Sequence, residues 1–145
     1  MQLPWYVLAI GAAVTWGMHY PMVDFALKRL SLYSVLLLTV IPVFLLMPFF
    51  MRQLENDIVT FKLLPGKEQL LILAISLTST AGAVLLYSSI NNKNATLASL
   101  IEVTYPVFVV FFAYVFYRQM HVTPSVFFGG LMILLGAGLI IYNHQ

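Results

Sequence analysis

One apolar stretch, from Asn94 to Arg118, is long enough to cross a bilayer as a helix and carries an acidic residue inside it. A helix rises about 1.5 Å per residue, so Glu102 lies roughly 12 Å from the Asn94 end of the stretch. That depth falls within the hydrocarbon region of a bilayer, which is about 30 Å thick. A carboxylate there is costly unless it is protonated, paired or facing water, so its presence indicates a functional site.

The composition is that of an integral membrane protein. Of the 145 residues, 61% are hydrophobic and 8% are charged, and the mean hydropathy is +0.95, far from the values of soluble domains. The length fits one helical bundle, so we expect a single transmembrane domain over residues 1–145. Cysteine is absent, which removes disulfides and thiol chemistry from consideration. No basic run points to nucleic acid as a partner.

Five apolar segments predict an all-α, polytopic membrane bundle of five transmembrane helices. The spans are expected at residues 3–21, 32–51, 70–90, 95–117 and 124–142. An odd number of spans places the two termini on opposite sides of the membrane. Pro42 and Pro48 predict kinks in the second span, which are as common in ordinary packing as in transporters.

The connections carry turn and capping signals. Residues 52–69 are expected to form the longest loop, with a turn at Pro65–Gly66 and room for a short interfacial helix. Thr123 before Pro124 predicts a helix N-cap followed by proline at the first helical position. Gly129, Gly130, Gly136 and Gly138 predict a last span that is thin and closely packed.

The seven basic residues divide almost evenly between the two faces of the membrane if the loops alternate sides. One face receives three and the other four: Lys28, Arg29 and Lys93 against Arg52, Lys62, Lys67 and Arg118. This is a weak bias under the positive-inside rule. Two interpretations stay open, a single orientation with the N-terminus inside and a dual topology with copies inserted both ways.

Several residues are expected at the depth of Glu102. Counting along antiparallel helices places Trp16 about level with the acid, with His19 one turn nearer the surface and Ser79 available from the third span. Burial disfavours the charged form of a carboxyl group, so Glu102 is suited to exchanging a proton for a cationic substrate. Trp16 and Tyr105 would supply cation–π contacts. The alternative is a structural acid, protonated or paired with His19, that sets the register of the helices.

Enzyme motifs are not evident. The chain has no H-E-x-x-H helix, G-x-S-x-G elbow or glycine-rich phosphate loop. We therefore expect no catalytic residues, no cofactor and no metal site.

With these residues laid out, the chain resembles a single EamA-type domain of the drug/metabolite transporter superfamily. The resemblance covers nearly all of the chain. It rests on Trp16–Gly17 followed by Pro21, on the segment NATLASLIEVTYPVF at residues 94–108, and on the glycine-rich last span. The family pattern often has a glutamate just after the fourth span, where this chain has Tyr117–Arg118–Gln119.

The resemblance implies a half-transporter. Family members usually join two such domains in inverted orientation, with the substrate path between ten helices. This chain would then act as a homodimer, in an antiparallel arrangement, or with a separate second half. We expect a secondary transporter for a small metabolite or drug-like solute in the bacterial cytoplasmic (inner) membrane, with Pro106 as a hinge beside the site. The competing hypothesis is a non-transporting membrane subunit that packs with another membrane protein.

Overall fold

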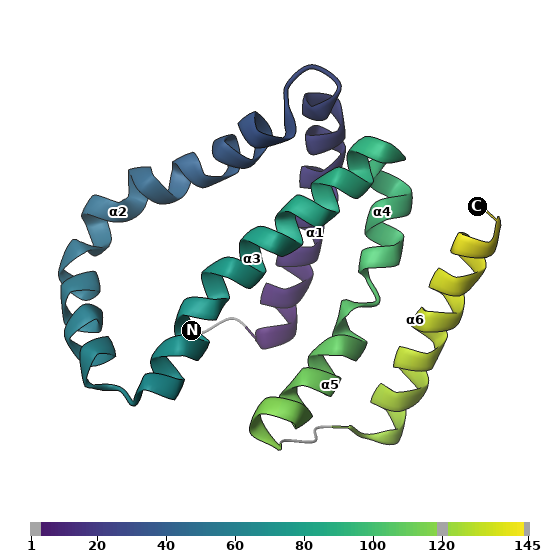
Figure 1. Ribbon diagram of the computed structural model, residues 1–145. Coiled ribbons are helices and arrows are strands. Elements are labelled where there is room, and N and C mark those ends of the chain that lie inside the picture. Colours follow the sequence, from purple (N-terminus) through teal and green to yellow (C-terminus); the bar gives the residue numbers. More distant parts are fainter. Residues whose placement is uncertain (1–3, 119–121, 144–145) are drawn as a thin grey trace. The chain divides into compact units, whose positions relative to one another are not determined.

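The computed structural model describes residues 4–118 and 122–143 (Figure 1). Within these residues the chain is all-helical, with six helices: α1 (Trp5–Leu27), α2 (Leu32–Leu63), α3 (Gly66–Asn92), α4 (Ala95–Glu102), α5 (Tyr105–Tyr117) and α6 (Pro124–Asn143). The expected start of the first span at Leu3, and Gln119 after the fourth, lie outside the described residues. The described chain divides into two compact units. The first comprises residues 4–22, 92–118 and 122–143, and the second comprises Val23–Asn91, so that the end of α1 belongs to the second unit.

The apolar helices confirm the predicted helical membrane fold. In the described part of the chain, four segments are long and apolar enough to cross a membrane: α2, α3, the α4–α5 segment taken together, and α6. Large apolar side chains are exposed along these helices, and a bilayer would cover them. α1 is 23 residues long but is not among these four segments; its second half carries Trp16, His19, Tyr20, Pro21 and Asp24. Its place as the first span stays a prediction.

In the second unit, α2 continues well beyond the expected end of the second span. The segment predicted to be a loop is helical as far as Leu63, since residues 52–63 contain neither glycine nor proline. Leu54, Ile58 and Phe61 recur at helical spacing and form an apolar stripe. The prolines at 42 and 48 lie inside the helix, and Figure 1 shows α2 as curved, as expected where carbonyl groups lose their N–H partners.

The turn between α2 and α3 lies where Pro65–Gly66 predicted it. α2 ends at Leu63 and α3 begins at Gly66. The Gln69 side chain closes this corner, because its Nε2 donates to the carbonyl of Phe61 at 3.1 Å and to that of Leu64 at 3.0 Å. The Phe61 carbonyl also accepts from the Leu64 amide at 3.2 Å, so the Gln69 side chain adds to the bonding at a helix end, where intrahelical partners run out.

In the first unit, α4 packs beside α6, as Figure 1 also shows. Small side chains allow this approach, and Ala95, Ala98 and Ala137 are buried. Asn94 caps α4, its side chain accepting a hydrogen bond of 2.8 Å from the Leu97 amide. α6 begins at Pro124, and the Thr123 hydroxyl accepts a bond of 3.4 Å from the Val126 amide, so the predicted cap is confirmed.

The glycines of α6 do not all make the close contacts that the sequence predicted. A Cβ added at Gly130 would meet the Val107 side chain at 3.5 Å, whereas one added at Gly129, Gly136 or Gly138 would meet no described atom within 4 Å. Close packing of these three glycines within the described chain is therefore not observed.

Candidate functional site

Glu102 is the last residue of α4, and its side chain contacts α1. The Tyr20 hydroxyl donates a hydrogen bond of 2.7 Å to Oε2 of Glu102, and both side chains are partly buried. The two residues are 82 positions apart in the sequence and belong to the same compact unit. The acid therefore has a specific neutral partner, which is how a polar group can be accommodated away from water.

The helix that carries Glu102 ends at this residue. The span predicted as one helix over 95–117 is divided into α4 and α5, with a turn at Val103–Thr104. Pro106 explains the break, because it has no N–H to bond the Glu102 carbonyl, four residues earlier. The Thr104 amide instead bonds the Ile101 carbonyl at 3.1 Å. Non-helical backbone in a membrane segment is tolerated where protein covers it or where it lines a cavity.

An aromatic cluster on α1 surrounds the tyrosine that contacts the acid. The ring centroids of Trp16 and Tyr20 are 5.6 Å apart, those of Trp16 and His19 are 5.2 Å apart, and those of His19 and Tyr20 are 6.2 Å apart. Residues three and four positions apart share one helix face, so this spacing follows from the helix itself. The Trp16 side chain is 52% exposed, which leaves part of its ring accessible.

The remaining predicted site residues are less closely connected. Tyr105 begins α5 and is 58% exposed, and Pro106 follows it at the helix break. Ser79 lies on α3 in the second unit, where it is exposed. The functional roles of Trp16, His19, Tyr105 and Ser79 stay predictions.

Tyr20 was not among the predicted site residues, because the first span was expected to end at Pro21. The helix continues to Leu27, since a single proline removes one hydrogen bond without stopping a membrane helix. Counted from that end, Tyr20 lies roughly 10 Å deep, close to the roughly 12 Å of Glu102 from Asn94. A depth count from the correct helix end would have included Tyr20 among the candidates.

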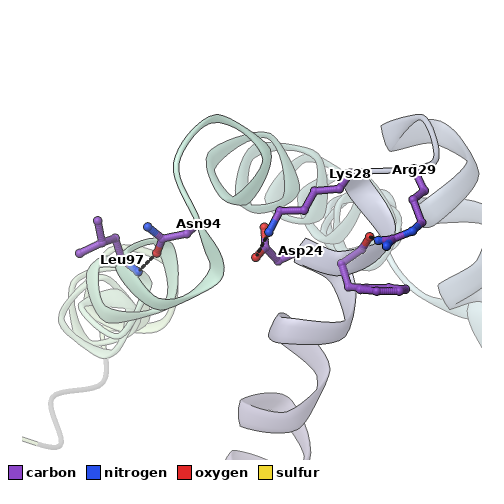
Figure 2. Close-up of polar contacts among 6 residues, drawn as sticks. Asp24, Lys28, Arg29, Asn94 and Leu97 are labelled. Atoms are coloured by element: carbon purple, nitrogen blue, oxygen red, sulfur yellow. Dashed lines mark hydrogen bonds and ion pairs between the residues drawn. The ribbon is translucent and has the colours of Figure 1, made fainter.

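The charged residues at the end of α1 are bound locally. Lys28 Nζ lies 3.0 Å from Oδ2 of Asp24. The Arg29 guanidinium donates to the Phe25 carbonyl at 3.1 Å and lies 3.7 Å from the centroid of the Phe25 ring. Figure 2 shows these contacts, together with the Asn94 cap. Such contacts are typical of basic residues that anchor a helix end at the membrane surface.

The second unit also contains a buried tyrosine and an apolar hollow. In the second unit, Tyr87 is buried and makes a side-chain hydrogen bond with Thr39. The same unit has an open hollow with a mainly apolar lining that includes Leu54, Ile58 and Phe61 of α2 and Ile72 and Leu73 of α3. Binding sites usually combine such a lining with convergent polar groups. Over residues 4–118 and 122–143, no group of three or more His, Asp or Glu side chains is arranged to hold a metal ion.

Comparison with protein-family models matches the EamA-like transporter family over residues 3–142. The match confirms the resemblance to an EamA-type domain and extends over nearly the whole chain. Comparison with curated proteins found no match, and comparison with solved structures also found none.

Proposed function

Because the chain belongs to the EamA-like transporter family and is thus a membrane transporter protein, we propose that it is one half of a proton-coupled secondary transporter. In this proposal Glu102 exchanges a proton for a small metabolite or drug-like solute. The second half is another copy of the chain or a separate half-domain. The working form is a dimer in the bacterial cytoplasmic membrane.

The observation that carries the proposal is the hydrogen bond between Tyr20 and Glu102. A hydroxyl group can donate to a charged carboxylate and, after rotating, accept from a protonated carboxyl group. It therefore suits an acid that alternates between its two forms. A lysine or arginine partner would hold the carboxylate in its charged form, which a purely structural ion pair requires.

The helix break supports the same function. Glu102 ends α4, Val103 and Thr104 form the turn, and Tyr105 begins α5. A change in backbone angle at Val103–Thr104 would reorient α5 relative to the acid without breaking either helix. Transporters of other folds place coupling sites at interrupted helices near the middle of the membrane. Pro106 would act there as the hinge.

The solute would be recognised by charge and by aromatic surface. Glu102 supplies one negative charge when its proton leaves. Trp16 and Tyr105 are half-exposed aromatic residues, and aromatic faces attract cations within about 6 Å of the ring centroid. The site thus favours solutes that carry a positive charge on an organic framework.

The test is transport by the full chain reconstituted into liposomes with a pH gradient. A panel of amines, amino acids and drug-like solutes would be scored for solute-dependent loss of the gradient. Glu102→Gln should abolish coupled transport while leaving membrane insertion intact, because the amide cannot release a proton. Glu68→Gln is the matched control, since Glu68 lies exposed in the first turn of α3.

Two results would refute the assignment. One is a Glu102→Gln protein that couples transport to the gradient as the unchanged protein does. The other is a Glu102→Gln protein that cannot be recovered from membranes, which would give the acid a structural role.

A further inference from the structure

We propose that the Tyr20 hydroxyl occupies the Glu102 carboxylate in the empty site and must leave before an organic monocation binds there. This inference rests on the proposed function and assigns Tyr20 as a positioning residue. It starts from the 2.7 Å bond, in which the phenol donates to Oε2. That distance is typical of a strong O–H···O contact to an acid.

The tyrosine is held in place for this role by its neighbours. The Trp16 ring lies 5.6 Å from the Tyr20 ring, and the His19 ring lies 6.2 Å from it. Both neighbours are on α1 in the same unit, and Tyr20 is partly buried. A donor that is already positioned loses little freedom when it bonds the acid, so it competes effectively with an incoming ligand.

The one carboxylate of the unit defines the class of ligand. In residues 4–22, 92–118 and 122–143, Glu102 is the one acidic residue. A single carboxylate neutralises a single positive charge, and a second charge on the ligand would remain uncompensated in a low-dielectric environment. The partly exposed Trp16 ring adds a face that suits quaternary ammonium groups. The ligand is therefore a singly charged organic cation.

If the Tyr20 hydroxyl competes with the ligand, removing this hydroxyl should lower the dissociation constant of the cation. Without the Tyr20 donor, the carboxylate does not have to release the hydrogen bond that the structure describes, so a cation should bind more tightly. Hydrogen bonds to charged groups are strong enough that the dissociation constant should fall about tenfold. A tyrosine that merely supported the fold, or that contacted the ligand directly, would weaken binding when changed.

The experiment uses the fluorescence of Trp16. The chain has two tryptophans, so Trp5→Phe leaves Trp16 as the one reporter, 5.6 Å from the Tyr20 ring. The full chain in liposomes would be titrated with tetrabutylammonium, a monocation without hydrogen-bond donors. The variants are Tyr20→Phe, Glu102→Gln and Tyr6→Phe, the last being the same substitution elsewhere on α1.

The expected result is tighter binding of tetrabutylammonium to Tyr20→Phe, unchanged binding to Tyr6→Phe, and no binding to Glu102→Gln. If Tyr20→Phe cannot be recovered, Tyr20→Met removes the same donor with a more adaptable side chain, and the same direction is expected.

Unchanged or weaker binding to the Tyr20 variants would overturn the competition while leaving Glu102 as the coupling residue. Binding that is absent, or indifferent to Glu102→Gln, would overturn the cation assignment and the competition together. The proton-coupled role of Glu102 would then be decided separately by the pH-gradient assay with the wider panel.

Discussion

Pro106→Ala should stabilise the protein and slow transport at the same time. The substitution restores an N–H at position 106, which can bond the Glu102 carbonyl and continue α4 into α5. Pro106 lies in the first turn of α5, where proline costs little, but in a continuous α4–α5 helix it would be interior and about 3 kcal/mol less favourable than alanine. The turn bonds to the Ile101 and Thr104 carbonyls, each 3.1 Å long, would be exchanged for helical ones with little net change.

The size of the stability change in Pro106→Ala can be estimated from these contacts. Allowing for partial relaxation of packing around Val107, which lies near Gly130, we expect the continuous helix to gain about 2 kcal/mol. If the interrupted form is needed for transport, its population falls roughly thirtyfold, since 1.4 kcal/mol corresponds to a factor of about ten.

Two assays check this pair of effects, thermal unfolding in detergent and transport in liposomes. The apparent Tm of Pro106→Ala should rise while its transport rate falls. Pro124→Ala is the control, because Pro124 is the first residue of α6, where an N–H has no helical partner in any case. A Pro106→Ala protein that is less stable, or that transports at the original rate, would refute the reasoning.

Two further predictions concern the ends of the chain's helices and its orientation. Asn94→Ala should lower stability by about 1 kcal/mol, because the Leu97 amide loses its 2.8 Å acceptor; Asn94→Asp should restore most of the loss, and thermal unfolding measures both. If the second half is an antiparallel copy of the chain, a reporter fused after Gln145 should reach both sides of the membrane, in keeping with the nearly balanced loop charges; a signal on one side would leave a parallel dimer or a separate partner half.

Much of the candidate site followed from local patterns. Glu102 stands out because an acid within an apolar span is rare for energetic reasons. Trp16 and His19 were placed near it by depth, and the structure groups them with Tyr20, the residue that contacts the acid. The break after Glu102 was also encoded locally, because Pro106 lies four residues beyond it. The prediction of one continuous helix over residues 95–117 was wrong because it did not allow for this proline.

The choice of Tyr20 as partner could not be made from depth alone. Depth along a helix follows from the rise per residue, whereas the direction of a side chain around the axis depends on which helices pack together. The same limit applied to the glycines of α6, three of which face no described atom at Cβ distance. Small residues permit a close approach but do not select the neighbour.

The amino-acid pattern alone identifies this chain as a helical membrane protein of the EamA-like type. A bilayer offers no partners to backbone polar groups, so apolar segments must form helices whatever their neighbours are. Turn and cap residues such as Pro65–Gly66 and Thr123–Pro124 act within a few residues and were equally readable. That α1 brings the Tyr20 hydroxyl to Glu102 became evident from the packing of the helices. That contact joins residues 82 positions apart, and it depends on helix packing, which no local pattern specifies.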